Sequence, residues 1–219
     1  NRKALSGFKK PDHFDTNIVV IGGGSAGLVT SYIAAAVKAK VTLIERHKMG
    51  GDCLNTGCVP SKAIIRSAKF MSHVSRCQEF GIKHAQADFD FVEVMERVAS
   101  VIKKIEPHDS IERYTSLGVD VVTGEATITS PWSVEVNGKT ITAKNIVIAT
   151  GARPFIPPIE GIESVSYFTS SNLWDLRIKP EKLVVLGGGP IGTELTQAFG
   201  RLNISVTQVE MAPRILLRE

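Results

Sequence analysis

The fold of this chain is decided by Ile18-Val19-Val20-Ile21-Gly22-Gly23-Gly24-Ser25-Ala26-Gly27. A short β-branched run predicts a strand, and it leads directly into a G-x-G-x-x-G pattern that opens a small-residue helix. Val41-Thr42-Leu43-Ile44 then predicts a second strand, which ends at Glu45. Strand, glycine loop, helix, strand and acid in this order are typical of a dinucleotide-binding βαβ unit.

Each position of this pattern has a physical role. The first glycine makes the turn, the second lets the backbone approach a pyrophosphate, and the third lets the helix pack on the strand. Backbone N–H groups at the start of the helix hold the phosphates, and the acid accepts hydrogen bonds from ribose hydroxyls. The predicted contacts are Gly22, Gly24, Ser25, Ala26, Gly27 and Glu45.

The same unit returns later in the chain. Leu183-Val184-Val185-Leu186 leads into Gly187-Gly188-Gly189-Pro190-Ile191-Gly192, and the following strand ends at Glu210. The two glycine loops are 165 positions apart, and so are the two acids. One such loop is weak evidence, but two copies in register predict two dinucleotide sites. The second set of contacts is Gly187, Gly189, Gly192 and Glu210.

Two of the three cysteines lie in Gly50-Gly51-Asp52-Cys53-Leu54-Asn55-Thr56-Gly57-Cys58-Val59-Pro60-Ser61-Lys62. Residues five apart in an undistorted helix have Cα atoms about 8.5 Å apart, whereas a disulfide needs them within about 7 Å. If Cys53 and Cys58 are bridged, the backbone between them must therefore leave regular helix, which Asn55 and Gly57 permit. A disulfide that closes so short a loop stabilises a fold only weakly, which favours a redox role for the two cysteines.

Other roles for these cysteines are buried thiols or metal ligands. Zinc sites usually need four ligands with a second pair nearby, and the sequence shows no such pair, so we predict no metal site. The third cysteine, Cys77, lies in a polar run and is interpreted as an incidental thiol.

The chain resembles the flavin-dependent pyridine nucleotide–disulfide oxidoreductases, which include dihydrolipoamide dehydrogenase, glutathione reductase and mercuric reductase. The resemblance runs from about Asp15 to the last residue. It rests on both glycine loops, on the cysteine segment and on Ala149-Thr150-Gly151-Ala152-Arg153-Pro154. It implies a first site for FAD, a second for NAD(P)H, and a redox-active disulfide against the flavin.

The resemblance also implies roles for single residues. Cys53 is expected to be the interchange thiol and Cys58 the charge-transfer thiol. Lys62 is expected beside the flavin, paired with Glu194, because an unpaired buried charge is costly; the alternative is a surface lysine. Further residues match family positions that contact FAD, and they are Gly51, Asp52, Thr56, Gly57, Gly124, Ala126, Thr150 and Gly151. A carboxylate at Glu210 repels a 2′-phosphate and favours NADH, although the nearby Arg214 weakens this preference.

The 219 residues are fewer than in members of this family. By resemblance, we expect an α/β fragment with three ranges: a linker at 1–15, a Rossmann-like FAD-binding domain with three layers and a small β-meander at 16–153, and a truncated Rossmann-like NAD(P)-binding domain at 154–219. The dimerisation domain, with the catalytic histidine given to the partner subunit, would then be absent. We therefore expect a homodimeric parent and a fragment that is inactive alone.

Short motifs predict further elements. They are a helix from the cysteine segment into Lys69–Arg76, a helix at Phe89–Ile105, a short helix capped by Asp109 with Glu112 and ended by Gly118, a strand at Val119–Val122, a meander at 126–144 turning at Asn137-Gly138, and a core strand at Ile146–Ile148.

The net charge of +4 comes from acids and bases mixed along the chain. A nucleic-acid-binding protein would concentrate its basic side chains on one face, so we expect no nucleic-acid partner. The first ten residues are basic, with Arg2, Lys3, Lys9 and Lys10. They are interpreted either as a solvated linker or as part of a segment beside a membrane. No apolar run of about 18 residues is present, and the cysteine usage fits a reducing, cytoplasmic compartment.

The predicted function is hydride transfer from NAD(P)H to FAD, then to the Cys53–Cys58 disulfide, then to a small disulfide, dithiol or mercuric ion. The segment Pro107–Tyr114 resembles mercuric reductase-like sequences. The alternatives are a flavin- and nucleotide-binding module without turnover, and a thiol–disulfide relay without nicotinamide.

Overall fold

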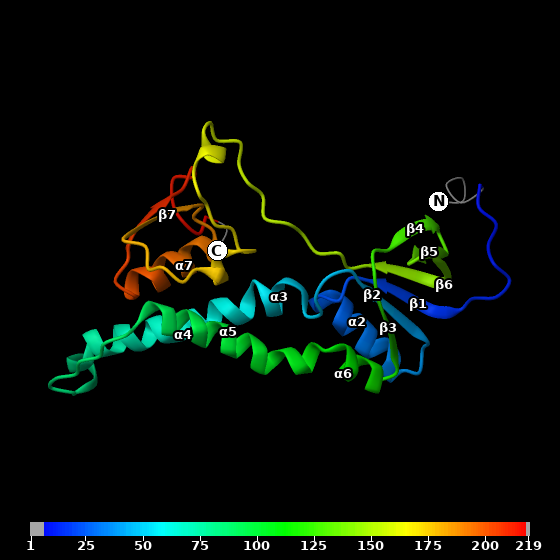
Figure 1. Ribbon diagram of the computed structural model, residues 1–219, viewed down its shortest axis with the longest axis horizontal. Coiled ribbons are helices and arrows are strands. Elements are labelled where there is room, and N and C mark those ends of the chain that lie inside the picture. Colours follow the sequence, from blue (N-terminus) through cyan, green and yellow to red (C-terminus); the bar gives the residue numbers. More distant parts are fainter. Residues whose placement is uncertain (1–6, 218–219) are drawn as a thin grey trace. The chain divides into compact units, whose positions relative to one another are not determined.

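The computed structural model describes residues 7–217 (Figure 1). The basic residues Arg2 and Lys3 lie outside the described residues. By packing, the chain forms two compact units, and each is described by itself. The first unit holds residues 7–55 and 103–158, and the second holds 56–102 and 159–217.

The first unit is built on a six-stranded sheet in the order β3-β2-β1-β6-β5-β4. The strands are β1 (Thr16–Ile21), β2 (Val41–Glu45), β3 (Val119–Thr123), β4 (Thr127–Ser130), β5 (Ser133–Val136) and β6 (Lys139–Ile148). β1 pairs in parallel with both β2 and β6, and β2 pairs in parallel with β3. The apolar run Val41–Ile44 is buried throughout, as expected of a parallel strand covered on both faces.

The meander is continuous with this sheet rather than a separate piece. β5 pairs antiparallel with β4 and with β6. Asn137 has φ +51° and Gly138 φ +72°, the two left-handed residues that a tight hairpin turn needs. The structure corrects the sequence prediction here, because one strand, Lys139–Ile148, is both the last hairpin strand and the predicted core strand.

Three α-helices complete the first unit: α2 (Ser25–Ala36), α3 (Gly51–Asn55) and α6 (Ile111–Ser116), with a 3-10 turn, η2 (Glu106–Asp109). Leu28 of α2 and Tyr114 of α6 pack with buried strand residues such as Leu43. The predicted cap of α6 is wrong by one position, since Ser110 Oγ accepts the N–H of Arg113. A serine hydroxyl satisfies this free N–H as well as a carboxylate would, so local sequence did not decide between the two caps.

The second unit carries the second βαβ pattern. Its elements are α4 (Cys58–Ser75), η1 (Cys77–Phe80), most of α5 (Phe91–Ile105), η3 (Ile162–Ser164), η4 (Leu173–Asp175), β7 (Lys182–Leu186), α7 (Pro190–Arg201) and β8 (Ser205–Val209). β7 and β8 pair in parallel. A core that includes Ile64 of α4, Met95 of α5 and Phe199 of α7 joins these elements.

The packing units divide the chain at other positions than the predicted boundary between residues 153 and 154, and the predicted domains stay a prediction. Residues 56–102 pack with the second glycine-loop unit because the apolar faces of α4 and α5 bury against α7 and η4. Periodicity in the sequence predicts that a helix has an apolar face, but not which other surface covers that face.

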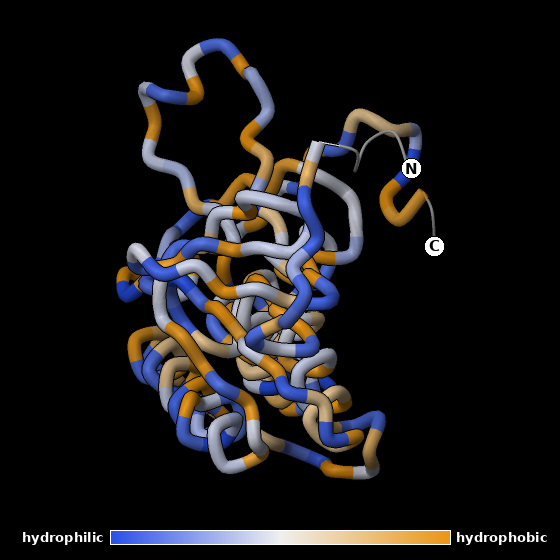
Figure 2. The backbone as a smooth tube through the Cα atoms, turned by 90° about the vertical axis from the view of Figure 1, so that its right-hand side faces the viewer, coloured by the Kyte–Doolittle hydropathy of each residue, from blue (hydrophilic) through white to orange (hydrophobic). Residues whose placement is uncertain are grey.

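None of the described helices is long and apolar enough to cross a membrane. Figure 2 colours the backbone by the hydropathy of each residue, and the hydrophobic colour comes in short runs between hydrophilic ones.

Candidate dinucleotide and thiol sites

The first glycine loop follows β1 in a geometry that only glycine permits at two positions. Gly22 has φ +109°, and its N–H donates to Ile44 O at 2.8 Å. A β-carbon on Gly22 would lie 2.3 Å from Ala149 O, and one on Gly27 would lie 1.8 Å from Gly22 O. The fold itself therefore requires the first and third glycines.

The second glycine is different. Gly24 precedes α2 with φ −86°, and among the described residues a β-carbon there would meet one atom, Gly51 Cα at an ordinary 3.6 Å. Packing thus does not demand glycine at this position, whereas an approaching phosphate would. Ser25 and Ala26 are exposed in the first turn of α2, where helical N–H groups have no partner within the helix. These residues fit a dinucleotide phosphate.

Glu45 is held beside this loop at the end of β2. Its Oε2 accepts the N–H of Gly23 at 2.6 Å, and its Oε1 accepts the N–H of His47 at 2.6 Å. Two backbone donors therefore fix the direction of the carboxylate. A carboxylate so placed can accept a further hydrogen bond from a hydroxyl, since each oxygen has two lone pairs.

The other predicted FAD contacts lie at the edge of the sheet formed by the carboxyl ends of its four parallel strands. Gly22 follows β1, Gly124 follows β3, and Thr150 follows β6 by two residues. The N–H of Gly124 donates to Glu45 O at 2.9 Å. Ala126 is half-buried and packs against the core cluster that includes Val136. Ligands of such sheets bind outside this edge, where neighbouring connections diverge.

The cysteine segment begins on this glycine loop. The N–H of Gly50 donates to Gly23 O at 2.9 Å. A β-carbon on Gly51, which has φ +53°, would lie 2.5 Å from Gly24 Cα. Asp52 Oδ2 lies 3.8 Å from the β-carbon position of Gly151. The structure therefore brings three sequence-predicted parts of the first site together within the first unit.

The second glycine loop repeats the geometry of the first. Gly187 has φ +111°, its N–H donates to Val209 O at 2.8 Å, and a β-carbon on Gly192 would lie 2.3 Å from Gly187 O. A β-carbon on Gly189 would meet nothing within 4 Å in the described part of the chain. Again the fold requires the first and third glycines and leaves the second open.

Glu210 takes the place of Glu45 in this copy. It accepts the N–H of Ala212 at 2.7 Å and the N–H of Gly188. These backbone hydrogen bonds, that of Ala212 above all, lower the pKa of Glu210 below the usual value for glutamate. The 165-residue offset seen in the sequence thus extends to the hydrogen bonds of both acids.

The two thiols flank a break between helices. Cys53 is half-buried in α3, which ends at Asn55, and Cys58 is exposed as the first residue of α4. Gly57 before it has φ −124° and ψ −107°. Asn55 Nδ2 donates to the carbonyl oxygens of Met49 at 3.0 Å and Gly51 at 2.9 Å. The predicted departure from regular helix is confirmed, and the bond between the two sulfur atoms stays a prediction.

Lys62 and Glu194 form the predicted ion pair within the second unit. Lys62 Nζ lies 2.6 Å from Glu194 Oε2. The two side chains are 61% and 45% exposed, and the place of Lys62 beside a flavin stays a prediction. Lys62 lies on the second turn of α4 and Glu194 on the second turn of α7.

One residue near the thiols was missed by sequence reasoning. Trp174 Nε1 donates to Thr56 O at 2.8 Å across 118 residues of chain. No motif marks this tryptophan, because the contact depends on tertiary packing alone.

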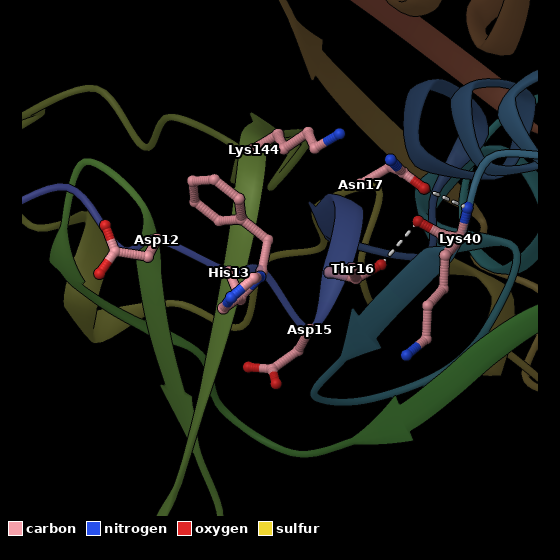
Figure 3. Close-up of a pocket in the computed structure, with 8 residues that line it drawn as sticks. Asp12, His13, Asp15, Thr16, Asn17, Lys40 and Lys144 are labelled. Carbon is pink, nitrogen blue, oxygen red and sulfur yellow. Dashed lines mark hydrogen bonds between the residues drawn. The ribbon is translucent and has the colours of Figure 1, made fainter.

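A hollow of about 360 Å³ lies at the amino end of β1, away from the glycine loop (Figure 3). Its lining residues are Asp12, His13, Phe14, Asp15, Thr16, Asn17, Lys40 and Lys144. Within it, hydrogen bonds to Asp15 from the N–H and hydroxyl of Thr142 lower the pKa of that carboxyl. In residues 7–217, no group of three or more His, Cys, Asp or Glu side chains is arranged to hold a metal ion.

The sequence profile of the pyridine nucleotide-disulphide oxidoreductases matches residues 16–219. The chain belongs to this family. Mercuric reductase of Bacillus cereus is 34% identical over 205 residues, which are 93% of this chain and 32% of that protein. Dihydrolipoyl dehydrogenase of Acholeplasma laidlawii is 36% identical over 204 residues, which are 91% of this chain and 60% of that protein.

Among solved structures of the family, the chain is similar to a copper(II) complex of the HOCl-induced flavoprotein disulfide reductase RclA of Escherichia coli. The TM-score is 0.78 at 30% identity, over 93% of this chain and 44% of that one. The α/β fold with a mainly parallel sheet is thus the fold of a flavoprotein disulfide reductase. The chain spans between about a third and three fifths of the length of these relatives.

Proposed function

We propose that the whole protein is an FAD-dependent NAD(P)H:disulfide or mercuric ion oxidoreductase. The observation that carries the proposal is the packing of Gly50 and Gly51, which begin the cysteine segment, on the first glycine loop. A thiol segment joined to a dinucleotide loop is what electron transfer between a flavin and a disulfide requires.

Within this proposal, the first glycine loop binds the FAD pyrophosphate and Glu45 binds a ribose hydroxyl. Gly124 and Ala126 offer backbone groups to the adenine, and the chain from Thr150 to Gly151 borders the same edge. When bound, FAD would accept a hydride from NAD(P)H and supply two electrons to the Cys53–Cys58 disulfide.

The thiols have separate tasks. Cys58 begins α4, where the positive end of the helix dipole favours a thiolate. Cys53 is the thiol that exchanges with substrate. Lys62, held by Glu194, would place a positive charge near the flavin. The substrate class is a small disulfide, a dithiol or a mercuric ion.

NADH is the proposed nucleotide. The carboxylate of Glu210 is fixed at the second glycine loop, and its lowered pKa keeps it ionised. A fixed negative charge repels a 2′-phosphate and accepts from a 2′-hydroxyl. Arg214 donates from Nη2 to Leu217 O at 3.2 Å, which supports a structural role for that cation. We further propose a cytoplasmic homodimer for the whole protein.

The test is an anaerobic visible spectrum of the purified whole protein with FAD, before and after NADH. We expect bound flavin whose absorption bleaches with NADH, and more slowly with NADPH. A Cys53→Ser variant should still bleach but lose reduction of a disulfide substrate. Flavin that binds but does not respond to either nucleotide would contradict the proposal.

A binding module without turnover is the second candidate. NADH-dependent reduction of a dye acceptor separates the two, because a module would bind both nucleotides and reduce no dye.

A further inference from the structure

We infer that Trp174 is a positioning residue for the thiol segment, acting through the backbone carbonyl of Thr56. This inference rests on the proposed redox role of Cys53 and Cys58. Trp174 donates a hydrogen bond to the backbone of Thr56, two residues before Cys58.

The contact is a hydrogen bond made inside a core. The indole N–H of Trp174 lies 2.8 Å from Thr56 O, and the residue is 8% exposed. A buried indole N–H that lacks a partner is costly, so tryptophan is placed in a core where an acceptor is within reach. Here that acceptor is the chain between the two cysteines.

The tryptophan is itself fixed from several sides. Its ring belongs to the core that includes Ile64 of α4 and Phe199 of α7. Arg177 Nη1 donates to Trp174 O at 2.8 Å and to Leu176 O at 3.0 Å, which fixes the backbone around η4. An anchor held this firmly can restrain a neighbouring segment.

The segment that Trp174 contacts includes a conformationally permissive residue. Gly57, which precedes α4, is the most permissive residue type, and no described side chain caps this helix start. The peptide unit is planar, so fixing Thr56 O also orients the N–H of Gly57 in the same plane. Trp174 therefore limits the backbone freedom directly before Cys58.

This restraint matters for thiol chemistry because a disulfide forms in a narrow range of geometry. Holding the chain before the reaction lowers the conformational entropy lost on closing the bond. A hydrogen bond of ordinary net strength corresponds to about a threefold to tenfold change in such an equilibrium. Loss of the indole N–H should therefore disfavour the Cys53–Cys58 disulfide by about this factor.

The experiment is a redox titration of the chain with reduced and oxidised glutathione. Cys53 and Cys58 lose two protons and two electrons, one S–S bond forms, and one glutathione disulfide is reduced to two glutathione molecules. Trp174→Phe removes the donor and keeps an aromatic ring. The matched control is Trp132→Phe, which changes the only other tryptophan, in the β4–β5 turn of the first unit.

We expect the equilibrium constant for disulfide formation to fall about threefold to tenfold in Trp174→Phe and to stay unchanged in Trp132→Phe. Equal constants in both variants, with both folded by circular dichroism, would overturn the inference. If the wild-type chain forms no Cys53–Cys58 disulfide at all, the proposed redox role fails, which is a separate outcome.

A second measurement does not depend on the folding of Trp174→Phe. In the Trp132→Phe chain, Trp174 is the sole source of tryptophan emission. Its emission should change when the thiols are oxidised, because the acceptor of its N–H lies in the segment that closes. Emission that is the same before and after oxidation would count against the inference, and a Cys58→Ser background shows whether any change requires the disulfide.

Discussion

Gly27 lies directly over the carbonyl oxygen of Gly22, so closely that a β-carbon on Gly27 would sit 1.8 Å from that oxygen. The start of α2 can therefore pack on the end of β1 only when residue 27 has no side chain. The same relationship holds between Gly192 and Gly187 at 2.3 Å. The third glycine of each loop is thus a requirement of folding before it is one of binding.

Replacing Gly27 with alanine should lower the free energy of unfolding of the first unit by about 1–3 kcal/mol, since backbone must move to admit the methyl group. Gly24→Ala is the control, and the expected cost is less than about 1 kcal/mol because its β-carbon has room. Urea titrations of both variants measure this. A tolerated Gly27→Ala would mean that the helix and strand separate easily.

Gly24→Ala should instead weaken FAD binding at least tenfold while the unit stays folded. The expected reason is that the methyl group occupies the space through which a phosphate approaches the backbone. Fluorescence titration of FAD against the variant measures the loss. Unchanged affinity would show that the pyrophosphate does not approach the loop at this position.

The ion pair of Lys62 and Glu194 should add little to stability. Both side chains are substantially exposed, and exposed pairs contribute about 0.2–1 kcal/mol. A double-mutant cycle with Lys62→Met and Glu194→Gln gives the coupling energy, which should shrink as salt is added. A coupling energy above about 2 kcal/mol that does not change with salt concentration would indicate an ion pair shielded from water.

The carboxylate of Glu210 should make stability depend on pH below neutrality. Its folded-state pKa is lowered from the usual 4.5, so its stabilising effect is complete above that value and is lost as the pH falls through the lower, folded-state pKa. Glu210→Gln removes this titration. The difference in unfolding midpoint between wild type and variant should therefore be constant above pH 4.5 and diminish below it. A difference that grows on acidification has the opposite sign and would contradict the shift.

Both glycine loops, their strands and their acids could be predicted from sequence because each depends on neighbours within about thirty residues. The turn at Asn137 and Gly138 was predictable for the same reason, since positive φ has a strong residue preference. The departure from regular helix between the cysteines followed from their spacing on the condition that the two are bridged.

What the sequence could not predict depends on contacts between distant surfaces. The packing of residues 56–102 with α7, and the hydrogen bond from Trp174 to Thr56, join segments about a hundred residues apart. The exposure of the Lys62 pair also depends on what surrounds α4, which no local pattern contains. The residues of the site can therefore be predicted from sequence motifs, whereas the tertiary contacts that support them cannot.

Two glycines offer a last test in which the same substitution has opposite effects. Gly138 has φ +72°, so an alanine there would be strained by about 1–2 kcal/mol. Gly200 lies in α7, and a β-carbon there would meet nothing within 4 Å in the described chain. Alanine loses less conformational entropy on folding than glycine, so Gly200→Ala should stabilise by about 0.4–1 kcal/mol. Thermal unfolding of the two variants gives both signs in one experiment. If both substitutions destabilise, residue 200 does not keep its helical conformation.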